Sequence, residues 1–260
     1  MAGGHGKFVW YELLTTDPKA AEAFYGKVFG WRMDPGNAAG MPYTHINVGN
    51  TAIGGIMELP EELKTHGTPS NWSGYIGVDD VDATAARIVE AGGTVRRPAE
   101  DIPNVGRFAV VADPAGAVFL IFKGTGNDNM PPRPPMGTPG YVDWNEVHGG
   151  AAEDSFKFYA GLFGWTKSDV LDMGPVMGPY LIFQIGGIPS GGMMKKTPDM
   201  PMSCWVYYVS VDDIDAAQKR VTDNGGTSVF GPQEVPGGAW ILQAVDPQGA
   251  FFAMVGPRKK

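Results

Sequence analysis

Two glutamates are the residues best suited to do chemistry in this chain. Glu12 and Glu146 each stand two residues after a tryptophan, Trp10 or Trp144, in segments that alternate like strands. Because strand side chains alternate between faces, each glutamate shares a face with its tryptophan. Burial raises the pKa of an unpaired carboxylate, which suits a general base. The alternative is a structural glutamate that is hydrogen bonded and fixes the geometry of the strand.

Two histidines accompany the glutamates. His148 follows Glu146 by two residues on the same strand face, and His45 lies on another expected strand in the first half of the chain. Each is a candidate general base or ligand-binding donor near neutral pH. The matching positions in the other half hold Leu14 for His148 and Ile182 for His45, so each histidine is present in only one half of the repeat. A structural role remains the alternative for both.

Aromatic and basic side chains are the candidate ligand contacts. Trp10 and Trp144 offer flat surfaces on which a planar ligand can stack. The alternative is that they fill the space that a ligand would occupy. The other expected contacts are Tyr43, Tyr180, Trp72, Trp205 and Arg107. Arg107 suits an anionic group on a ligand. Alternatively it pairs with Glu12, which would remove that carboxylate as a base.

The segments that carry these residues occur twice. The pattern Trp-x-Glu followed by Phe-Tyr-x-x-x-Phe-Gly-Trp spans 10–31 and returns 134 residues later at 144–165. Gly-Gly pairs and an Asp-Pro-x-Gly sequence also recur in order. A feature kept in both halves is structural or belongs to a shared kind of site. A feature found in one half is the better candidate for specialised chemistry.

Each half is expected to fold as a strand, a helix and three strands, followed by the same order again. In the first half the pattern predicts strands at 8–14, 43–48, 51–57, 72–78, 107–112 and 117–122. Asp17-Pro18 and Asp79-Asp80 are helix starts, and Gly30 and Gly92-Gly93 are helix stops. Val81, Ala85 and Ile88 are the expected buried stripe of the second helix.

The second half follows the same order, with strands expected at 142–148 and 205–211. Between the halves, the segment 124–139 is rich in Pro, Gly, Asn and Asp. Such a composition is typical of a linker. The expected domains are therefore 1–123 and 140–260. The Gly-Gly pairs at 54–55 and 191–192 lie within or beside strands, where glycine permits a bulge or a close backbone approach.

Composition excludes several classes of protein. With 43% hydrophobic residues the chain can bury a core, and its net charge of −8 argues against nucleic acid or an anionic membrane as partner. The single cysteine, Cys204, excludes an intrachain disulfide and is expected to be a small buried residue. No signal peptide and no spanning segment are apparent, so a cytoplasmic protein is expected.

The order of elements and the two repeated motifs resemble the vicinal oxygen chelate superfamily. The motifs are the Phe-Tyr-x-x-x-Phe-Gly-Trp sequences at 24–31 and 158–165 and the Asp-Pro-x-Gly sequences at 113–116 and 246–249. That superfamily includes glyoxalase I, bleomycin resistance proteins and extradiol dioxygenases, and the chain looks most similar to its two-domain bacterial glyoxalase-like members. The resemblance implies an α+β fold of tandem glyoxalase-like domains. Each domain would be a pair of βαβββ units with a curled mixed sheet around a cavity.

The resemblance also implies where metal ligands would lie. The corresponding positions here are Trp10, Gly54, Ser73 and Leu120, with Trp144, Gly191, Val206 and Ala253 in the second half. None is a histidine or a glutamate, whereas a divalent metal needs several converging N, O or S donors. We therefore expect no metal and no other cofactor. The bleomycin resistance type, which binds a drug without a protein-bound metal, fits this departure.

Three functions remain open. The first is a metal-independent protein that binds a small organic molecule in an aromatic-lined cavity. The second is an enzyme of lyase, isomerase or hydroxylase/dioxygenase type, acting on a small carbonyl or aromatic compound with Glu12 or Glu146 as base. The third is an interaction scaffold whose cavities are closed. A small molecule is the expected partner, and an open sheet edge allows a homodimer.

Overall fold

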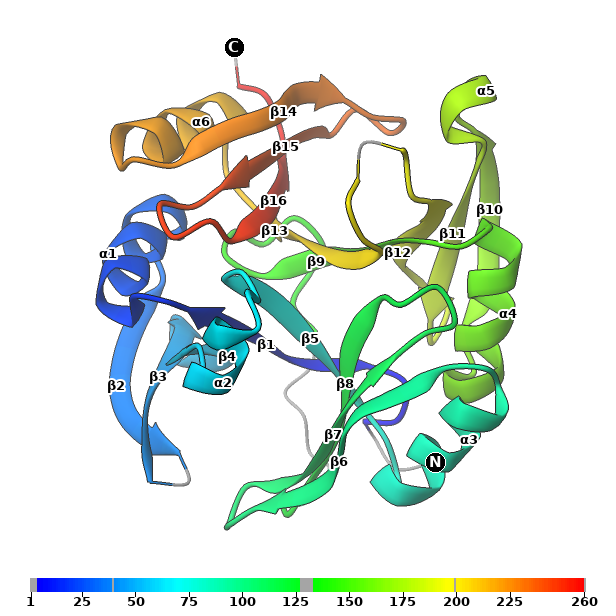
Figure 1. Cartoon of the computed structure of the whole chain (residues 1–260). Helices are drawn as coiled ribbons and strands as arrows, with labels where there is room; N and C mark the ends of the chain where they lie inside the picture. The colour runs from blue at the N-terminus through cyan, green and yellow to red at the C-terminus, as the bar shows by residue number, and fades with distance from the viewer. Residues whose placement is uncertain (1–3, 39, 127–132, 199, 260) are drawn as a thin grey trace. The chain divides into compact units, whose positions relative to one another are not determined.

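The computed structural model describes residues 4–38, 40–126, 133–198 and 200–259 (Figure 1). The elements of the first half are β1 (Phe8–Thr15), α1 (Pro18–Phe29), β2 (Arg32–Ala38), β3 (Met41–Val48), β4 (Thr51–Glu58), α2 (Glu61–Thr65), β5 (Asn71–Gly77), α3 (Val81–Glu90), β6 (Thr94–Ile102), β7 (Gly106–Ala112) and β8 (Val118–Gly124). Those of the second half are β9 (Val142–Gly149), α4 (Ala152–Phe163), β10 (Thr166–Asp172), α5 (Gly174–Met177), β11 (Pro179–Ile185), β12 (Ile188–Lys195), β13 (Cys204–Ser210), α6 (Ile214–Asp223), β14 (Thr227–Glu234), β15 (Trp240–Val245) and β16 (Phe251–Gly256).

Each half of the sequence forms one mixed sheet of eight strands. The strand orders are β2-β3-β4-β1-β5-β8-β7-β6 and β10-β11-β12-β9-β13-β16-β15-β14, and neither sheet closes on itself. In each βαβββ unit the first strand is parallel to the last, as β1 is to β4 and β5 is to β8. The remaining pairs within a unit are antiparallel. This arrangement confirms the expected α+β fold.

Local signals set the ends of the helices. The Asp17 carboxylate accepts a hydrogen bond from Ala20 N, Pro18 occupies the first turn, and α1 ends at Gly30 with φ 71°. Glycine adopts this left-handed conformation without a Cβ clash. In α3 the expected stripe needs one correction, because Thr84 is buried with Val81 and Ile88 while Ala85 is only half-buried. The Thr84 hydroxyl bonds the Asp80 carbonyl, so its polar group is satisfied there.

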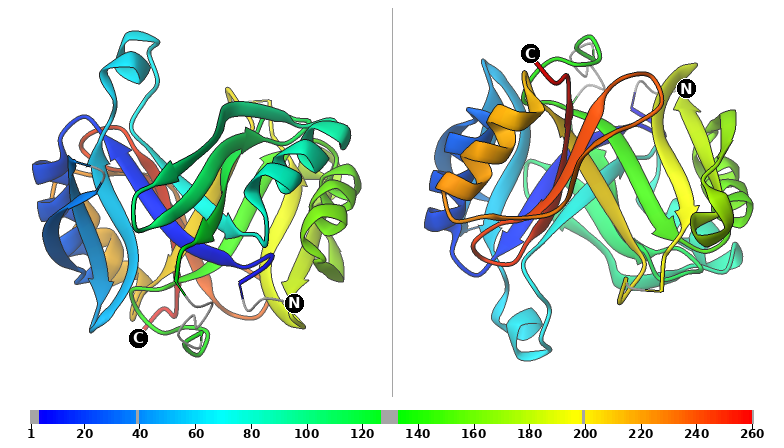
Figure 2. Two further views of the ribbon diagram at one scale, coloured as in Figure 1. Left: turned by 90° about the horizontal axis from the view of Figure 1, so that it is seen from below. Right: turned by 90° about the horizontal axis from the view of Figure 1, so that it is seen from above.

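The chain packs into two compact units, and each combines segments from both halves of the sequence. Unit 1 contains Met1–Val9, Gly74–Pro132 and Trp144–Val206, and unit 2 contains Trp10–Ser73, Arg133–Asp143 and Tyr207–Lys260. Helices α3 and α4 lie side by side in unit 1, as α1 and α6 do in unit 2 (Figures 1 and 2). The expected domains 1–123 and 140–260 follow the two sheets, and as domain boundaries they stay a prediction. Part of the expected linker 124–139 lies outside the described residues.

A buried tyrosine joins the two sequence halves within unit 2. The Tyr25 hydroxyl donates to Asp246 Oδ2 at 2.9 Å, and Trp72 Nε1 donates to the same hydroxyl at 2.9 Å. The other carboxylate oxygen of Asp246 accepts the backbone N–H groups of Gln248 and Ala250. The Phe-Tyr motif of the first half is therefore bonded to the Asp-Pro-x-Gly turn of the second.

Unit 1 contains the reciprocal connection. Tyr159 donates to Asp113 Oδ2 at 3.0 Å, and Trp205 Nε1 donates to the Tyr159 hydroxyl at 3.1 Å. Burial raises the pKa of Asp113 and of Asp246, while the hydrogen bonds that each carboxylate accepts lower it. Donors therefore surround both carboxylates, as buried polar groups require.

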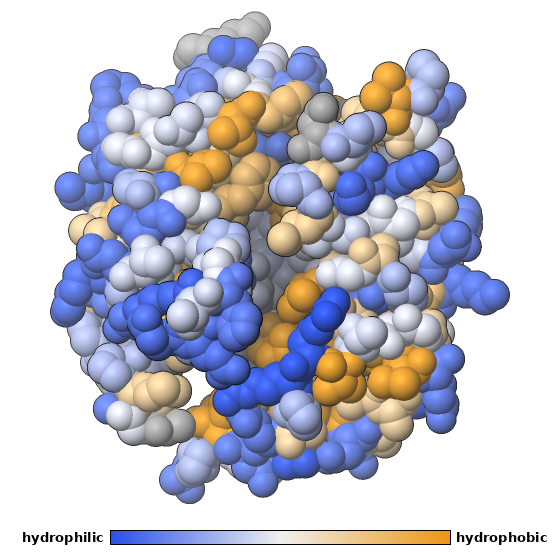
Figure 3. Space-filling view, viewed as in Figure 1, coloured by the Kyte–Doolittle hydropathy of each residue, from blue (hydrophilic) through white to orange (hydrophobic). Residues whose placement is uncertain are grey.

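The surface is more polar than the core. The face shown in Figure 3 is mostly hydrophilic, with small groups of hydrophobic residues between the polar ones. Among the described residues, no helix combines the length and apolar character that crossing a membrane would require.

We expect Tyr25→Phe and Tyr159→Phe each to lower the free energy of unfolding by about 1–3 kcal/mol. Either change leaves a buried carboxylate oxygen and an indole N–H without their hydroxyl partner. Chemical denaturation measures the effect. Tyr141→Phe is the matched control, because no hydrogen bond of the Tyr141 side chain is seen among the described residues. Equal stability of all three variants would contradict the assignment.

Candidate functional site

The first candidate site is a hydrogen-bonded chain of three side chains in unit 2. Trp10 Nε1 donates to the Tyr43 hydroxyl at 2.7 Å, and Tyr43 donates to Glu12 Oε1 at 2.9 Å. Trp10 and Glu12 share a face of β1, as the strand period predicts, and Tyr43 reaches them from β3. We call this chain the first triad.

The second triad repeats this arrangement in unit 1. Trp144 Nε1 donates to the Tyr180 hydroxyl at 2.7 Å, and Tyr180 donates to Glu146 Oε2 at 2.6 Å. Glu12 is 9% exposed and Glu146 is 7% exposed, so both carboxylates are buried. The two tryptophans and two tyrosines are half-buried. The structure thus brings together six of the residues that the sequence singled out.

Glycines make room for the two tyrosines. Gly55 on β4 pairs with Glu12 of β1 on one side and with His45 of β3 on the other, so it lies between the strands that the triad joins. A Cβ on Gly55 would overlap the Tyr43 ring, and a Cβ on Gly192 would overlap the Tyr180 ring. The sequence predicted a bulge or a close backbone approach at these Gly-Gly pairs. A backbone carbonyl does lie against Gly54 and Gly191, but the group close to Gly55 and Gly192 is a tyrosine ring.

Burial and the nearby carboxylate keep Tyr43 protonated. Burial raises the pKa of the Tyr43 hydroxyl, the negative charge of Glu12 raises it further, and the hydrogen bond from Trp10 lowers it. The hydroxyl is therefore the donor to Glu12 at neutral pH. The order of donors is fixed, because an indole N–H cannot accept a hydrogen bond and a carboxylate cannot donate one.

The two histidines occupy different places around the triads. His148 Nε2 lies 2.8 Å from Glu146 Oε1, and the His148 side chain is 9% exposed. Its Nδ1 is buried and has no hydrogen-bond partner among the described residues. His45 instead packs its ring edge-on against Trp10 at 6.0 Å and Tyr43 at 5.2 Å between ring centroids.

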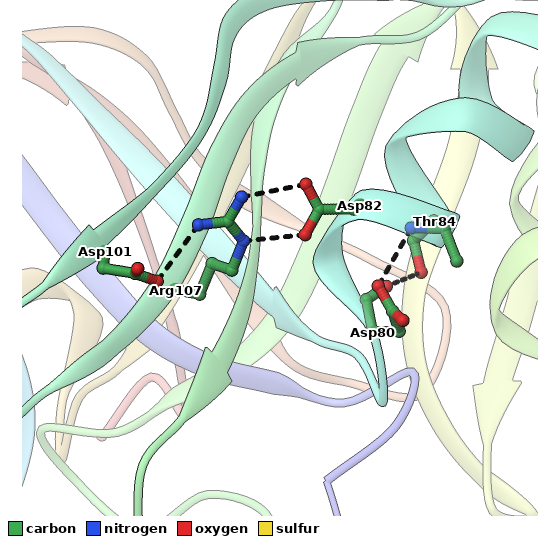
Figure 4. A network of polar contacts seen from close by, with 6 residues as sticks. Asp80, Asp82, Thr84, Asp101 and Arg107 are labelled. Carbon is green, nitrogen blue, oxygen red and sulfur yellow. Dashed lines mark hydrogen bonds and ion pairs between the residues drawn. The ribbon is translucent and has the colours of Figure 1, made fainter.

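Arg107 is bound by two aspartates of its own unit. Its guanidinium binds both oxygens of Asp82 on α3 at 2.7 and 2.9 Å, and it also binds Asp101 at 3.1 Å (Figure 4). The hydrogen bonds to Asp82 raise the pKa of the arginine and lower that of Asp82. The alternative pairing of Arg107 with Glu12 is not seen within the described ranges. Contact of Arg107 with a ligand stays a prediction.

The two remaining tryptophans among the candidate ligand contacts, Trp72 and Trp205, pack against the core. Trp72 and Trp205 donate to the buried hydroxyls of Tyr25 and Tyr159. Trp72 also lines a cavity of about 20 Å³ in unit 2, together with Tyr25, Trp31 and Phe252. Such a volume is close to that of one water molecule. This cavity is therefore too small for an organic ligand.

Sequence reasoning missed one feature of the second site. Cys204 is half-buried, and the pKa of its thiol is raised to about 11 by burial and by the negative charge of Glu146. The thiol therefore lies within the field of the carboxylate. The only sequence signal was its position beside Trp205 at the start of an apolar run.

Comparisons with known proteins agree with the fold. The family model described as "Glyoxalase/Bleomycin resistance protein/Dioxygenase superfamily" matches residues 7–121 and 143–254. The chain is 32% identical over 253 residues to the protein named "Putative glyoxylase CFP32" of Mycobacterium tuberculosis, covering 95% of this chain and 94% of that protein. It is 31% identical over 268 residues to "Anthracycline biosynthesis protein DnrV" of Streptomyces peucetius, covering 96% and 93%.

Solved structures show the same fold. The 2,3-dioxygenase LapB from Pseudomonas sp. KL28 has a TM-score of 0.65 at 13% identity, over 100% of this chain and 94% of that one. The Mn(II)-bound glyoxalase from Novosphingobium aromaticivorans has a TM-score of 0.65 at 18% identity, over 98% and 83%. At these identities the likeness concerns the fold alone.

The residues of this chain do not fit a metal at the positions that the resemblance implies. The N–H groups of Trp10 and Trp144 are donated to tyrosines, and indole nitrogen offers no lone pair to a metal. Ser73 is the one oxygen donor among the eight positions, and its hydroxyl bonds Asn71. Across the described ranges, no group of three or more His, Cys, Asp or Glu is placed to hold an ion. No step of a mechanism is therefore assigned to a metal.

We expect Gly55→Ala and Gly192→Ala each to destabilise the fold by about 1–3 kcal/mol, because the added methyl group overlaps a tyrosine ring. Thermal unfolding monitors this loss. Gly161→Ala is the control, since Gly161 lies in helix α4 with open space at its Cβ position. That change should be neutral or stabilising by up to about 1 kcal/mol. Wild-type stability of Gly55→Ala and Gly192→Ala would refute the tyrosine placement.

Alkylation of Cys204 should report the charge of Glu146. With a thiol pKa of about 11, the reaction with iodoacetamide at pH about 8 should be roughly two orders of magnitude slower than for an ordinary thiol. Glu146→Gln removes one of the two causes of the raised pKa and should speed the reaction several-fold. Glu12→Gln serves as control and should leave the rate unchanged. A rate insensitive to Glu146→Gln would contradict this electrostatic coupling.

Proposed function

The chain belongs to the Glyoxalase/Bleomycin resistance protein/Dioxygenase superfamily, and on that premise we propose that it binds a small planar organic molecule without a protein-bound metal. One observation carries the proposal. Where the resemblance places metal ligands on β1 and β9, this chain has tryptophans whose N–H groups are donated to tyrosines. An aromatic pair replaces a donor group at both positions.

The triads suit the binding of an aromatic compound. In each one, a half-buried indole donates a hydrogen bond to a half-buried phenol, and the phenol donates to a buried carboxylate, which holds the two rings beside each other. Rings fixed in this way contact a planar ligand at a low cost in side-chain entropy. A relative named for anthracycline biosynthesis makes anthracyclines the first ligands to test.

The second triad supports an enzymatic role less well than it supports ligand binding. Glu146 accepts hydrogen bonds at both oxygens, from Tyr180 at Oε2 and from His148 at Oε1 when the imidazole proton is on Nε2. A general base needs an oxygen within hydrogen-bond reach of the substrate proton. Catalysis by Glu12 or Glu146 stays a prediction of the sequence.

Metal content and ligand binding test the proposal together. Untagged protein purified without chelators should contain far less than one metal per chain by inductively coupled plasma mass spectrometry. It should bind an anthracycline in a fluorescence titration, and the Trp10→Phe, Trp144→Phe double variant should bind about fivefold more weakly, or about 1 kcal/mol.

Tyr141→Phe is the control variant, because Tyr141 belongs to neither triad. One tightly held metal per chain would overturn the metal-independent part of the proposal. Unchanged affinity in the tryptophan double variant would overturn the aromatic site.

A further inference from the structure

The two triads share their geometry, but the histidine beside the first triad is more exposed than the histidine beside the second. His45 is half-buried, and its ring makes contacts with Trp10 and Tyr43 but no hydrogen bond within the described part of the chain. Beside its Nδ1 lies Gly36 of β2, where an added Cβ would be 3.8 Å from the nitrogen. A Cβ at Gly36 would make only an ordinary contact with this nitrogen, so the accessibility of His45 rests on its half-buried side chain.

The imidazole of the second triad is enclosed. His148 is 7% exposed, its Nε2 contacts Glu146, and its Nδ1 is buried with no partner among the residues described. An unpaired buried polar atom is costly, and because this nitrogen is buried, a ligand would have to displace protein groups to reach it. His148 contacts the carboxylate of Glu146 through Nε2, so we regard it as a residue that positions this carboxylate.

We propose that the chain binds one ligand, at the first triad, and that this ligand is a planar hydroxyaromatic compound. Its ring contacts Trp10 and Tyr43, and its hydroxyl group donates a hydrogen bond to the imidazole of His45. This inference rests on the proposed function and adds the half that binds, the stoichiometry and the ligand class.

The ligand class follows from the groups that the first triad exposes. Two rings offer stacking or edge contacts to a flat molecule. A neutral imidazole has one acceptor nitrogen, and a phenolic hydroxyl can donate a hydrogen bond to it, which an ether cannot. The duplicated second triad offers comparable aromatic rings but encloses its imidazole, so only the first triad supplies both kinds of contact.

Two naphthalenes that differ in one group test the inference by isothermal titration calorimetry. 2-Naphthol has a hydroxyl group, and 2-methoxynaphthalene has the same ring system without the donor hydrogen. Wild-type protein should bind one 2-naphthol per chain, about three- to tenfold more tightly than the methoxy compound, because one net hydrogen bond separates them.

The duplicated chain supplies its own controls. His45→Phe keeps a ring against Trp10 and Tyr43 but removes both nitrogens, so the preference for 2-naphthol should disappear. His148→Gln retains a donor to Glu146 and should leave that preference unchanged. Trp10→Phe should weaken both compounds several-fold, whereas the matched Trp144→Phe should not. In ¹H–¹⁵N spectra, 2-naphthol should shift the imidazole signals of His45 and not those of His148.

The outcomes separate this inference from the proposed function. Binding of two ligands per chain would overturn the inference alone, as would binding that is sensitive to His148→Gln and Trp144→Phe instead of the first-half variants. Equal affinity of wild-type protein for the two naphthalenes would overturn the hydroxyaromatic class. No binding of either naphthalene, and none of an anthracycline, would overturn both proposals. Circular dichroism establishes that each variant is folded.

Discussion

The buried hydrogen bond between a tyrosine and an aspartate holds each compact unit together. Tyr25 and Asp246 are 221 residues apart, so this bond joins an α1 residue to a turn near the end of the chain. A buried carboxylate requires several donors, and Asp246 receives them from the tyrosine and from its own turn. Neither sequence half contains all of these groups. The duplicated chain therefore builds each core from both copies.

The same requirement organises the candidate sites. Each triad begins with an indole that can only donate and ends with a carboxylate that only accepts, so the tyrosine hydroxyl between them has one possible direction. Three polar groups from β1 and β3 are thereby satisfied together in the first half. Gly55 and Gly192 allow this because the tyrosine rings occupy the space that a Cβ would fill.

Duplication followed by divergence is visible at the histidines. The triads are nearly identical, so their presence in both halves fits a structural requirement as well as a binding surface. The imidazoles differ in both strand and exposure, and one is tied to a carboxylate while the other is not. The two halves therefore differ at two positions beside the triads, His45 against Ile182 and His148 against Leu14.

Sequence alone determined the repeat, the βαβββ order, the caps of α1, the shared face of Trp10 and Glu12 and the absence of histidine and glutamate at the expected metal positions. These properties depend on local periodicity and residue type. Sequence analysis assigned no residue range to β2 or β6, because these outer strands are largely exposed and lack apolar alternation. Only the tertiary structure decided that Tyr43 crosses Gly55 to reach Glu12 and that Arg107 binds Asp82. Such pairings depend on strand register and on side chains distant in the sequence, which local patterns do not encode.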